Sequence, residues 1–208
     1  MKKILMCLCL LVGYGMANDR SGAILGVEFG LSELNKIESD TTLGTEKNKD
    51  AAPLYGFKAG YKHFFTDLIG LQGYLSFKHS FNSNKYESEG TSSKTTYDFM
   101  PIMANADVIF DFYKSNNVSL DAIIGIGVGM AMVNEKYTSS SATGSSTQKI
   151  NYSGFYGDAR VGLGVNASNN RIGLVASFPF NSVNKTIDNV KYKVKQNYAV
   201  SLTYDYTF

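Results

Sequence analysis

The sequence lacks the residues that mark several common classes of protein. It has no tryptophan and only 2 cysteines, Cys7 and Cys9, which both lie in the apolar run near the N-terminus. Two cysteines exclude a disulfide-rich scaffold and a four-cysteine zinc site. Charged residues make up 18% of the chain and give a net charge of only +2, which excludes a strongly basic nucleic-acid-binding surface. No run of about 18 apolar residues is present, which excludes a transmembrane helix.

The N-terminus has the order of a secretory signal peptide. A basic start, residues 1–3, is followed by an apolar run over residues 4–12 and by the small residues Gly15 and Ala17. This order predicts a signal peptide over residues 1–17, with cleavage before Asn18. The run is too short for a membrane anchor, and its cysteines do not follow small residues at its end, which argues against a lipoprotein signal. We therefore expect an exported chain, residues 18–208, that has no cysteine.

Alternation with a period of two, which is typical of β-strands, recurs along the exported chain. In each alternating segment one face is apolar and often aromatic, whereas the other face combines glycine with polar and charged residues. The longest example runs from Tyr192 to Phe208, with Gln196 as the one polar residue on the apolar face. The eight segments are 22–32, 54–63, 69–79, 100–112, 118–132, 152–167, 171–180 and 192–208.

This pattern predicts an all-β fold, an eight-stranded antiparallel up-and-down transmembrane β-barrel. The bulky aromatic face suits lipid, the glycine-rich polar face suits a narrow interior, and closure pairs every backbone group, as a bilayer requires. Charges near the middle of the strands would then share the interior. We expect an ion-pair network among Glu28, Lys58, Asp107, Asp158 and Arg160.

The connections between the segments alternate in length. Bacterial outer-membrane barrels keep short turns on the periplasmic side and long loops outside the cell. We therefore expect both termini of the barrel, residues 18–208, to lie in the periplasm. The short turns are 64–68, 113–117 and 168–170, and the four long extracellular loops are about 33–53, 80–99, 134–151 and 181–191.

The C-terminal residues resemble the terminal signal of outer-membrane barrels. The chain ends in Phe208, and every second position before it is apolar or aromatic: Val200, Leu202, Tyr204 and Tyr206. The whole exported chain resembles small barrels of the OmpA/OmpX and opacity-protein type. Its composition is similar to that of small outer-membrane proteins of epsilonproteobacteria. The resemblance implies that the barrel-assembly machinery of the outer membrane recognises the last strand during insertion.

Candidate catalytic residues are few. His79 and Ser80 stand where a lipid A deacylase could act, but adjacent residues of a strand point to opposite faces and cannot share a reaction centre. His63 is expected at the other rim, as an interfacial residue. Two separated histidines and no cysteine predict no metal site. We expect no cofactor, no catalytic residue and no enzymatic activity.

The expected function is that of a monomeric surface protein of the bacterial outer membrane, serving envelope integrity and, through its loops, host contact or adhesion. Its expected partners are outer-membrane lipid and lipopolysaccharide, together with a host surface molecule, and no nucleic acid. Two alternatives stay open, a narrow porin-like channel and a lipid A-modifying enzyme. A barrel of eight strands has room only for its own side chains, which favours a filled interior over the channel.

Overall fold

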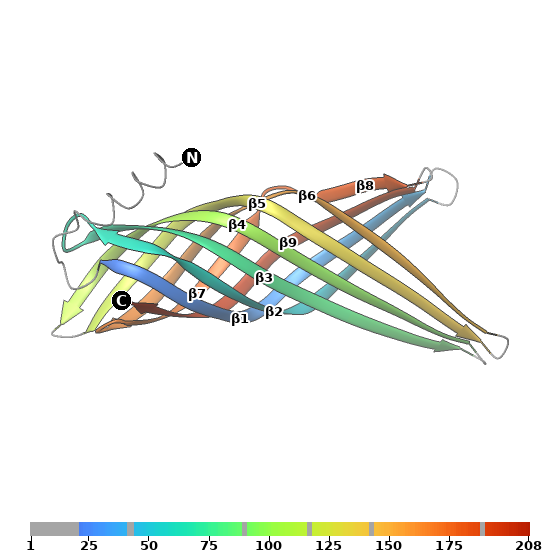
Figure 1. Ribbon diagram of the computed structural model, residues 1–208, viewed down its shortest axis with the longest axis horizontal. Helices are drawn as coiled ribbons and strands as arrows, with labels where there is room; N and C mark the ends of the chain where they lie inside the picture. Colours follow the sequence, from blue (N-terminus) through green and yellow to red (C-terminus); the bar gives the residue numbers. More distant parts are fainter. Residues whose placement is uncertain (1–20, 41–43, 89–90, 116–117, 142–143, 188–189) are drawn as a thin grey trace, which may run out of the picture.

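The computed structural model describes residues 21–40, 44–88, 91–115, 118–141, 144–187 and 190–208. The expected signal peptide and its cleavage site lie outside these residues. Within them no helix is long and apolar enough to cross a bilayer. Nine strands form a single antiparallel sheet in the described chain (Figure 1): β1 (Gly22–Asp40), β2 (Gly44–Phe64), β3 (Ile69–Ser88), β4 (Thr91–Ser115), β5 (Val118–Ser141), β6 (Gly144–Ala167), β7 (Asn170–Pro179), β8 (Val183–Ile187) and β9 (Val190–Thr207).

The sheet closes into a barrel with eight strand positions. Its order is β1 to β7, then β9, and β1 pairs with β9 to close the ring. The short strand β8 does not add a ninth position, because β7 and β8 pair with successive parts of β9. The structure therefore confirms the predicted all-β, antiparallel up-and-down barrel of eight strands.

The sheet is interrupted between β7 and β8, where a side chain forms the hydrogen bonds to β6. Strand β7 ends at Pro179, which has no backbone N–H to donate. Just beyond it, the Asn181 amide donates to the Phe155 carbonyl oxygen at 2.7 Å and accepts from the Gly157 N–H at 2.9 Å. Asn181 thus satisfies the backbone groups of β6 that a continuing strand would have paired.

The four segments expected as long loops are, for the most part, strands. Strand β1 continues to Asp40, β3 to Ser88 and β5 to Ser141. Their partners β2, β4 and β6 begin at Gly44, Thr91 and Gly144. The loop expectation was wrong because it rested on apolar alternation. A strand that lies outside the lipid needs no apolar residues on its outward face. Strands rich in serine and threonine therefore show no apolar alternation, although threonine itself favours strands.

The barrel divides into two sheets toward the ends of these hairpins, which we call its distal end. Pairing between β2 and β3 stops at Leu54 and Ser80, and pairing between β6 and β7 stops at Asp158 and Pro179. Beyond those points one sheet consists of β8, β9, β1 and β2, and the other of β3, β4, β5 and β6. Figure 1 shows these two distal sheets separating away from the end that carries the C-terminus.

The outward face of the undivided part carries the predicted apolar band. Large apolar side chains such as Phe29, Ile124 and Leu163 are about 60% exposed or more, on strands all round the barrel. One part of the predicted register is wrong: Val194 and Gln196 point inward, whereas Tyr198 points outward. A β-bulge, where Glu33 and Leu34 oppose Tyr198 and Gln196, inserts one residue and reverses the faces of β9.

Candidate functional site

The five residues of the expected ion-pair network all point into the barrel and are buried: Glu28, Lys58, Asp107, Asp158 and Arg160. They do not form one network. Asp107, Asp158 and Arg160 come together, whereas Glu28 and Lys58 pair with residues that the sequence analysis did not name.

Arg160 on β6 is the centre of the first group. Its Nη2 lies 2.7 Å from Asp158 Oδ1 and donates to Asn105 Oδ1 at 2.5 Å, while its Nε lies 3.7 Å from Asp107 Oδ1. Its Nη1 donates to the hydroxyl of Tyr74, whose ring it also faces. A guanidinium with five donors can satisfy several buried acceptors at once, which makes Arg160 the tie between β3, β4 and β6.

Glu28 and Lys58 belong to two further ion pairs. Lys58 Nζ lies 2.8 Å from Asp205 Oδ1, and Lys78 Nζ lies 3.4 Å from Glu28 Oε1. Ser201 also donates to Glu28, at 3.2 Å. Lys58 therefore joins β2 to β9, and Lys78 joins β3 to β1, each across the strand between.

A glycine of the intervening strand makes room for each of these pairs. Gly26 is paired in register with both Lys58 and Asp205. In the same way Gly56 is paired with both Glu28 and Lys78, and Gly125 with both Asp107 and Arg160. A Cβ at Gly26 would lie 2.1 Å from Asp205 Oδ1, and one at Gly125 would lie 1.8 Å from Asp107 Oδ1. We call these three contacts the glycine-crossed ion pairs.

Arg171 on β7 makes a fourth charged group toward the end of the barrel that carries the termini. Its Nε and Nη2 donate to the two carboxylate oxygens of Asp121 at 2.8 and 2.7 Å, and its Nη1 lies 3.5 Å from Asp205 Oδ2. Its guanidinium crosses Gly164, where a Cβ would lie 2.5 Å away. The signal for Lys78, Asp121, Arg171 and Asp205 was available in the sequence, because each occupies an inward position of its strand.

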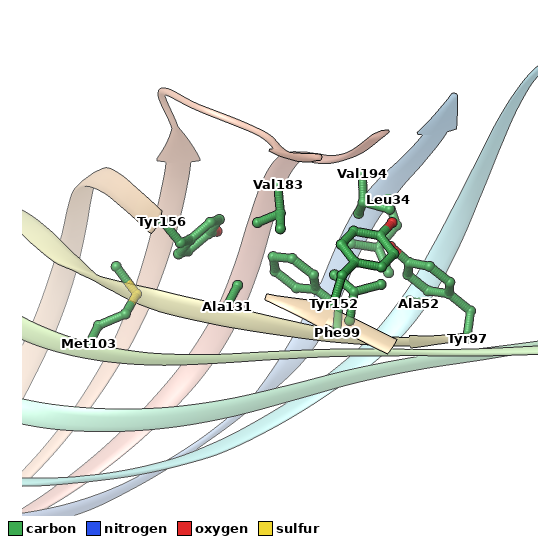
Figure 2. Close-up of a cluster of buried hydrophobic side chains, with 11 residues drawn as sticks. Leu34, Ala52, Tyr97, Phe99, Met103, Ala131, Tyr152, Tyr156, Val183 and Val194 are labelled. Carbon is green, nitrogen blue, oxygen red and sulfur yellow. The ribbon is translucent and has the colours of Figure 1, made fainter. Parts of the chain in front are cut away.

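The interior changes character at the distal end, where it becomes an apolar core. Figure 2 shows side chains from both distal sheets meeting there, with Leu34 and Val194 on one side and Tyr97, Phe99 and Tyr152 on the other. The whole cluster is Leu34, Ala52, Tyr97, Phe99, Met103, Ala131, Val133, Tyr152, Tyr156, Val183 and Val194. Lys36 and Glu135 form an ion pair that also links the two sheets. Burial in this core raises the pKa of the Tyr97 phenol well above its ordinary value.

A small cavity lies among the charged side chains of the interior. It has a volume of about 10 Å³ and lies between Glu28, Lys58, Tyr74, Lys78 and Arg160. That is about the volume that a single water molecule requires. The charged groups and the apolar core thus occupy successive parts of the described lumen.

The described outer surface carries a hydrogen-bonded chain of three side chains at the distal edge of the apolar band. His79 Nδ1 lies 2.5 Å from the Tyr55 hydroxyl, and His79 Nε2 lies 2.9 Å from Asp98 Oδ1. Ser80 is buried on the other face, where Ser32 donates to it at 3.0 Å. His79 and Ser80 thus point to opposite faces, whereas Tyr55 and Asp98, which the sequence analysis did not single out, are the partners of His79. At the opposite rim His63 packs edge-on against Phe65.

The C-terminal residues expected to form the assembly signal all face outward. The side chains of Val200, Leu202, Tyr204 and Tyr206 follow one another along the lipid-facing side of β9, and Phe208 comes directly after its end. Tyr206 and Phe208 stack edge-to-face with ring centroids 4.9 Å apart.

A closed antiparallel barrel with an apolar outer band and a charged, filled interior is the architecture of an outer-membrane β-barrel protein. The family model described as Helicobacter outer membrane protein matches residues 56–208. The chain therefore belongs to this family, and its place is the outer membrane. No curated protein matches the chain.

Several solved outer-membrane barrels are similar to the chain. The outer membrane protease OmpT of Escherichia coli is 10% identical with a TM-score of 0.56, over 90% of this chain and 97% of that one. Neisserial surface protein A is 17% identical with a TM-score of 0.40, over 90% of this chain and 98% of that one. Ail, the attachment invasion locus protein of Yersinia pestis, is 17% identical with a TM-score of 0.39, over 89% and 99%. At these identities the likeness to OmpT shows a shared fold and nothing about activity.

Proposed function

We propose that the protein is a non-enzymatic surface barrel that serves envelope integrity and contacts a host surface molecule through its two distal sheets. The observation that carries the proposal is the pair of distal sheets itself. They extend beyond the apolar band, and the apolar core between them holds them in place. Rigid elements that project from a membrane are suited to presenting a binding surface.

The lengths of the two ends support the expected orientation in the membrane. The distal hairpins are long and the opposite turns, such as the one between β2 and β3, are short. With the usual arrangement of bacterial barrels, the distal sheets face the outside of the cell and both termini face the periplasm. Lipid and lipopolysaccharide then surround the apolar band, and the barrel-assembly machinery reads the outward residues of β9 during insertion. A filled interior needs no second copy to complete it, which supports a monomer.

The two alternative functions find less support in the geometry. A channel needs a continuous path, whereas charged groups and then an apolar core occupy the lumen. A serine hydrolase needs its serine beside a histidine, whereas Ser80 lies inside the barrel and both ring nitrogens of His79 contact Tyr55 and Asp98.

Shortening the hairpins tests the proposed contact. Replacing residues 136–149 with Asn-Gly joins Glu135 to Ile150, which are already paired, and Asn-Gly favours a two-residue hairpin turn. The matched change replaces residues 85–94 and joins Asn84 to Thr95 in the same sheet. Binding of bacteria to host epithelial cells is then measured for each variant and for both changes together.

We expect bacteria that carry the doubly shortened protein to bind host epithelial cells no better than bacteria that lack the protein. The barrel should still insert, because both changes lie beyond the core, and heat-modifiable mobility on gels would verify this. Unchanged cell binding by a doubly shortened protein that is present at the cell surface would rule the proposal out.

A further inference from the structure

The lipid-facing side of the barrel is hollowed by an apolar groove of about 950 Å³ that crosses β9, β1, β2, β3 and β4. Its floor contains the small residues Val27 and Ala59, and bulky outward side chains stand around it. Among them are Leu25, Phe57, Leu75, Phe77, Ile102 and Tyr204. Because this face contacts the membrane, an acyl chain is the occupant that fits such a groove.

The groove ends directly below the Tyr55–His79–Asp98 chain. Phe57 and Phe77 are cross-strand partners at its distal end, and Tyr55 and His79 are the next outward pair on the same two strands. One such step along a strand is about 7 Å. An acyl chain in the groove therefore places the polar part of its lipid beside these three side chains.

The hydrogen bonds fix the position of the carboxylate that the lipid meets. A carboxylate can only accept, so His79 Nε2–H donates to Asp98, while His79 Nδ1 shares a second hydrogen bond with the Tyr55 hydroxyl. The side chain of Asp98 is 34% exposed, so the carboxylate is accessible from the interface.

We propose that this groove and Asp98 form a binding site for one membrane lipid whose head group carries an ammonium group with N–H donors. The acyl chain lies over Val27 and Ala59, and the ammonium donates to the Asp98 carboxylate. His79 and Tyr55 hold Asp98 in position, because both nitrogens of the ring are engaged. A choline head group carries the same charge but has no N–H to donate, and a glycerol head group has no positive charge.

The absence of tryptophan from the chain makes a site-specific fluorescence test possible. Phe77→Trp places a single reporter in the groove, and Phe178→Trp places a matched reporter on β7, at an outward position outside it. Each protein is placed in vesicles that mix phosphatidylethanolamine and phosphatidylcholine of identical chain length. Bromine on the acyl chains of a lipid quenches the fluorescence of a tryptophan that it contacts. One experiment brominates phosphatidylethanolamine and the other phosphatidylcholine, and together they give the binding constant of one lipid relative to the other.

We expect the Phe77→Trp reporter to show a preference of about tenfold for phosphatidylethanolamine, the size that one charge-assisted hydrogen bond supports. The Phe178→Trp reporter should show none. Adding Asp98→Asn to Phe77→Trp should abolish the preference, whereas Asp67→Asn in the turn at the opposite end should leave it unchanged. Equal binding of the two lipids at Phe77→Trp, or a preference that survives Asp98→Asn, would overturn the proposal.

A second pair of variants tests the groove separately from the head group. Ala59→Phe fills the floor and should weaken quenching of the Phe77→Trp reporter by both lipids. Ala159→Phe, at an outward alanine of β6, is the control and should change nothing. If Ala59→Phe leaves quenching unchanged, the acyl chain does not lie in the groove and the proposal is wrong. Heat-modifiable mobility verifies that each variant is folded.

Discussion

Glycine and charge complement each other inside this barrel, because the ion pairs occupy the space that additional Cβ atoms would take. Lys58 reaches Asp205 across Gly26, Lys78 reaches Glu28 across Gly56, and the Arg160 group crosses Gly125. The interior of an eight-stranded barrel is barely wider than its own side chains. The glycines therefore set where charges on alternate strands can meet.

Substitution of an interior glycine tests this arrangement. At Gly127 a Cβ would lie 2.2 Å from Arg160 Nη2 and 2.3 Å from Asn105 Oδ1. We expect Gly127→Ala to lower the free energy of unfolding by about 1–3 kcal/mol, since it overpacks a filled site. Urea unfolding followed by circular dichroism in lipid vesicles would measure it.

Gly73→Ala is the matched control, because a Cβ there would have its nearest neighbour at 3.9 Å. We expect this variant to stay within about 0.5 kcal/mol of the parent protein. Equal losses of stability at the two positions would show that glycine matters here through backbone flexibility and not through the space it leaves.

The sequence predicts which residues point inward, but it does not by itself predict which charges meet. Alternation places Glu28 and Lys58 correctly, whereas their partners depend on how far each strand is staggered against the next in the closed ring. The structure shows this stagger, because Gly26 lies between Lys58 and Asp205 and Gly56 lies between Glu28 and Lys78. Tyr55 and Asp98 gave no such signal, since polar residues at the edge of a lipid band are common.

At the scale of the strands, the distal sheets depend on a core of their own. Phe99 is almost completely buried, and its ring packs edge-to-face against Tyr156 with centroids 5.3 Å apart. We expect Phe99→Ala to cost about 3–5 kcal/mol of local stability, because it removes a large side chain from this core. The undivided barrel should keep its fold, since its pairing lies elsewhere.

Limited proteolysis of intact cells would show the effect. We expect Phe99→Ala to be cut within the distal hairpins under conditions in which the parent protein resists. Tyr137→Ala, at a 44% exposed position of β5, is the control and should resist as the parent does. Resistance of Phe99→Ala equal to that of the parent would mean that the core does not hold the two sheets.

The distal strands also mark where sequence patterns stop being informative. Within the apolar band lipid demands an apolar outward face, so the period of two is clear from Gly22 to Ser32 and in the other predicted segments. Beyond the band the same strand is an ordinary strand in water. There the inward residues, such as Leu34 and Val133, become apolar and the outward ones polar, so the polarity of the two faces is reversed.

At the scale of the whole molecule, the filled lumen has a direct electrical consequence. We expect the purified protein to give no reproducible unitary conductance in planar bilayers, because charged groups and then an apolar core occupy the described interior. A known porin in the same chamber is the positive control. Regular conductance steps from the pure protein would show that the interior rearranges to form a pore.

The division of the distal end into two sheets bears on how the protein can change over generations. Among the described residues the β2–β3 pairing ends at Leu54–Ser80 and the β6–β7 pairing at Pro179–Asp158, so the length of each distal sheet is independent of the other. Adding one residue to both strands of a hairpin at its tip lengthens it without moving any inward residue below. We expect related chains, and variants selected by immune pressure, to differ at these tips by insertions and deletions in matched pairs, while the ring beneath keeps its register.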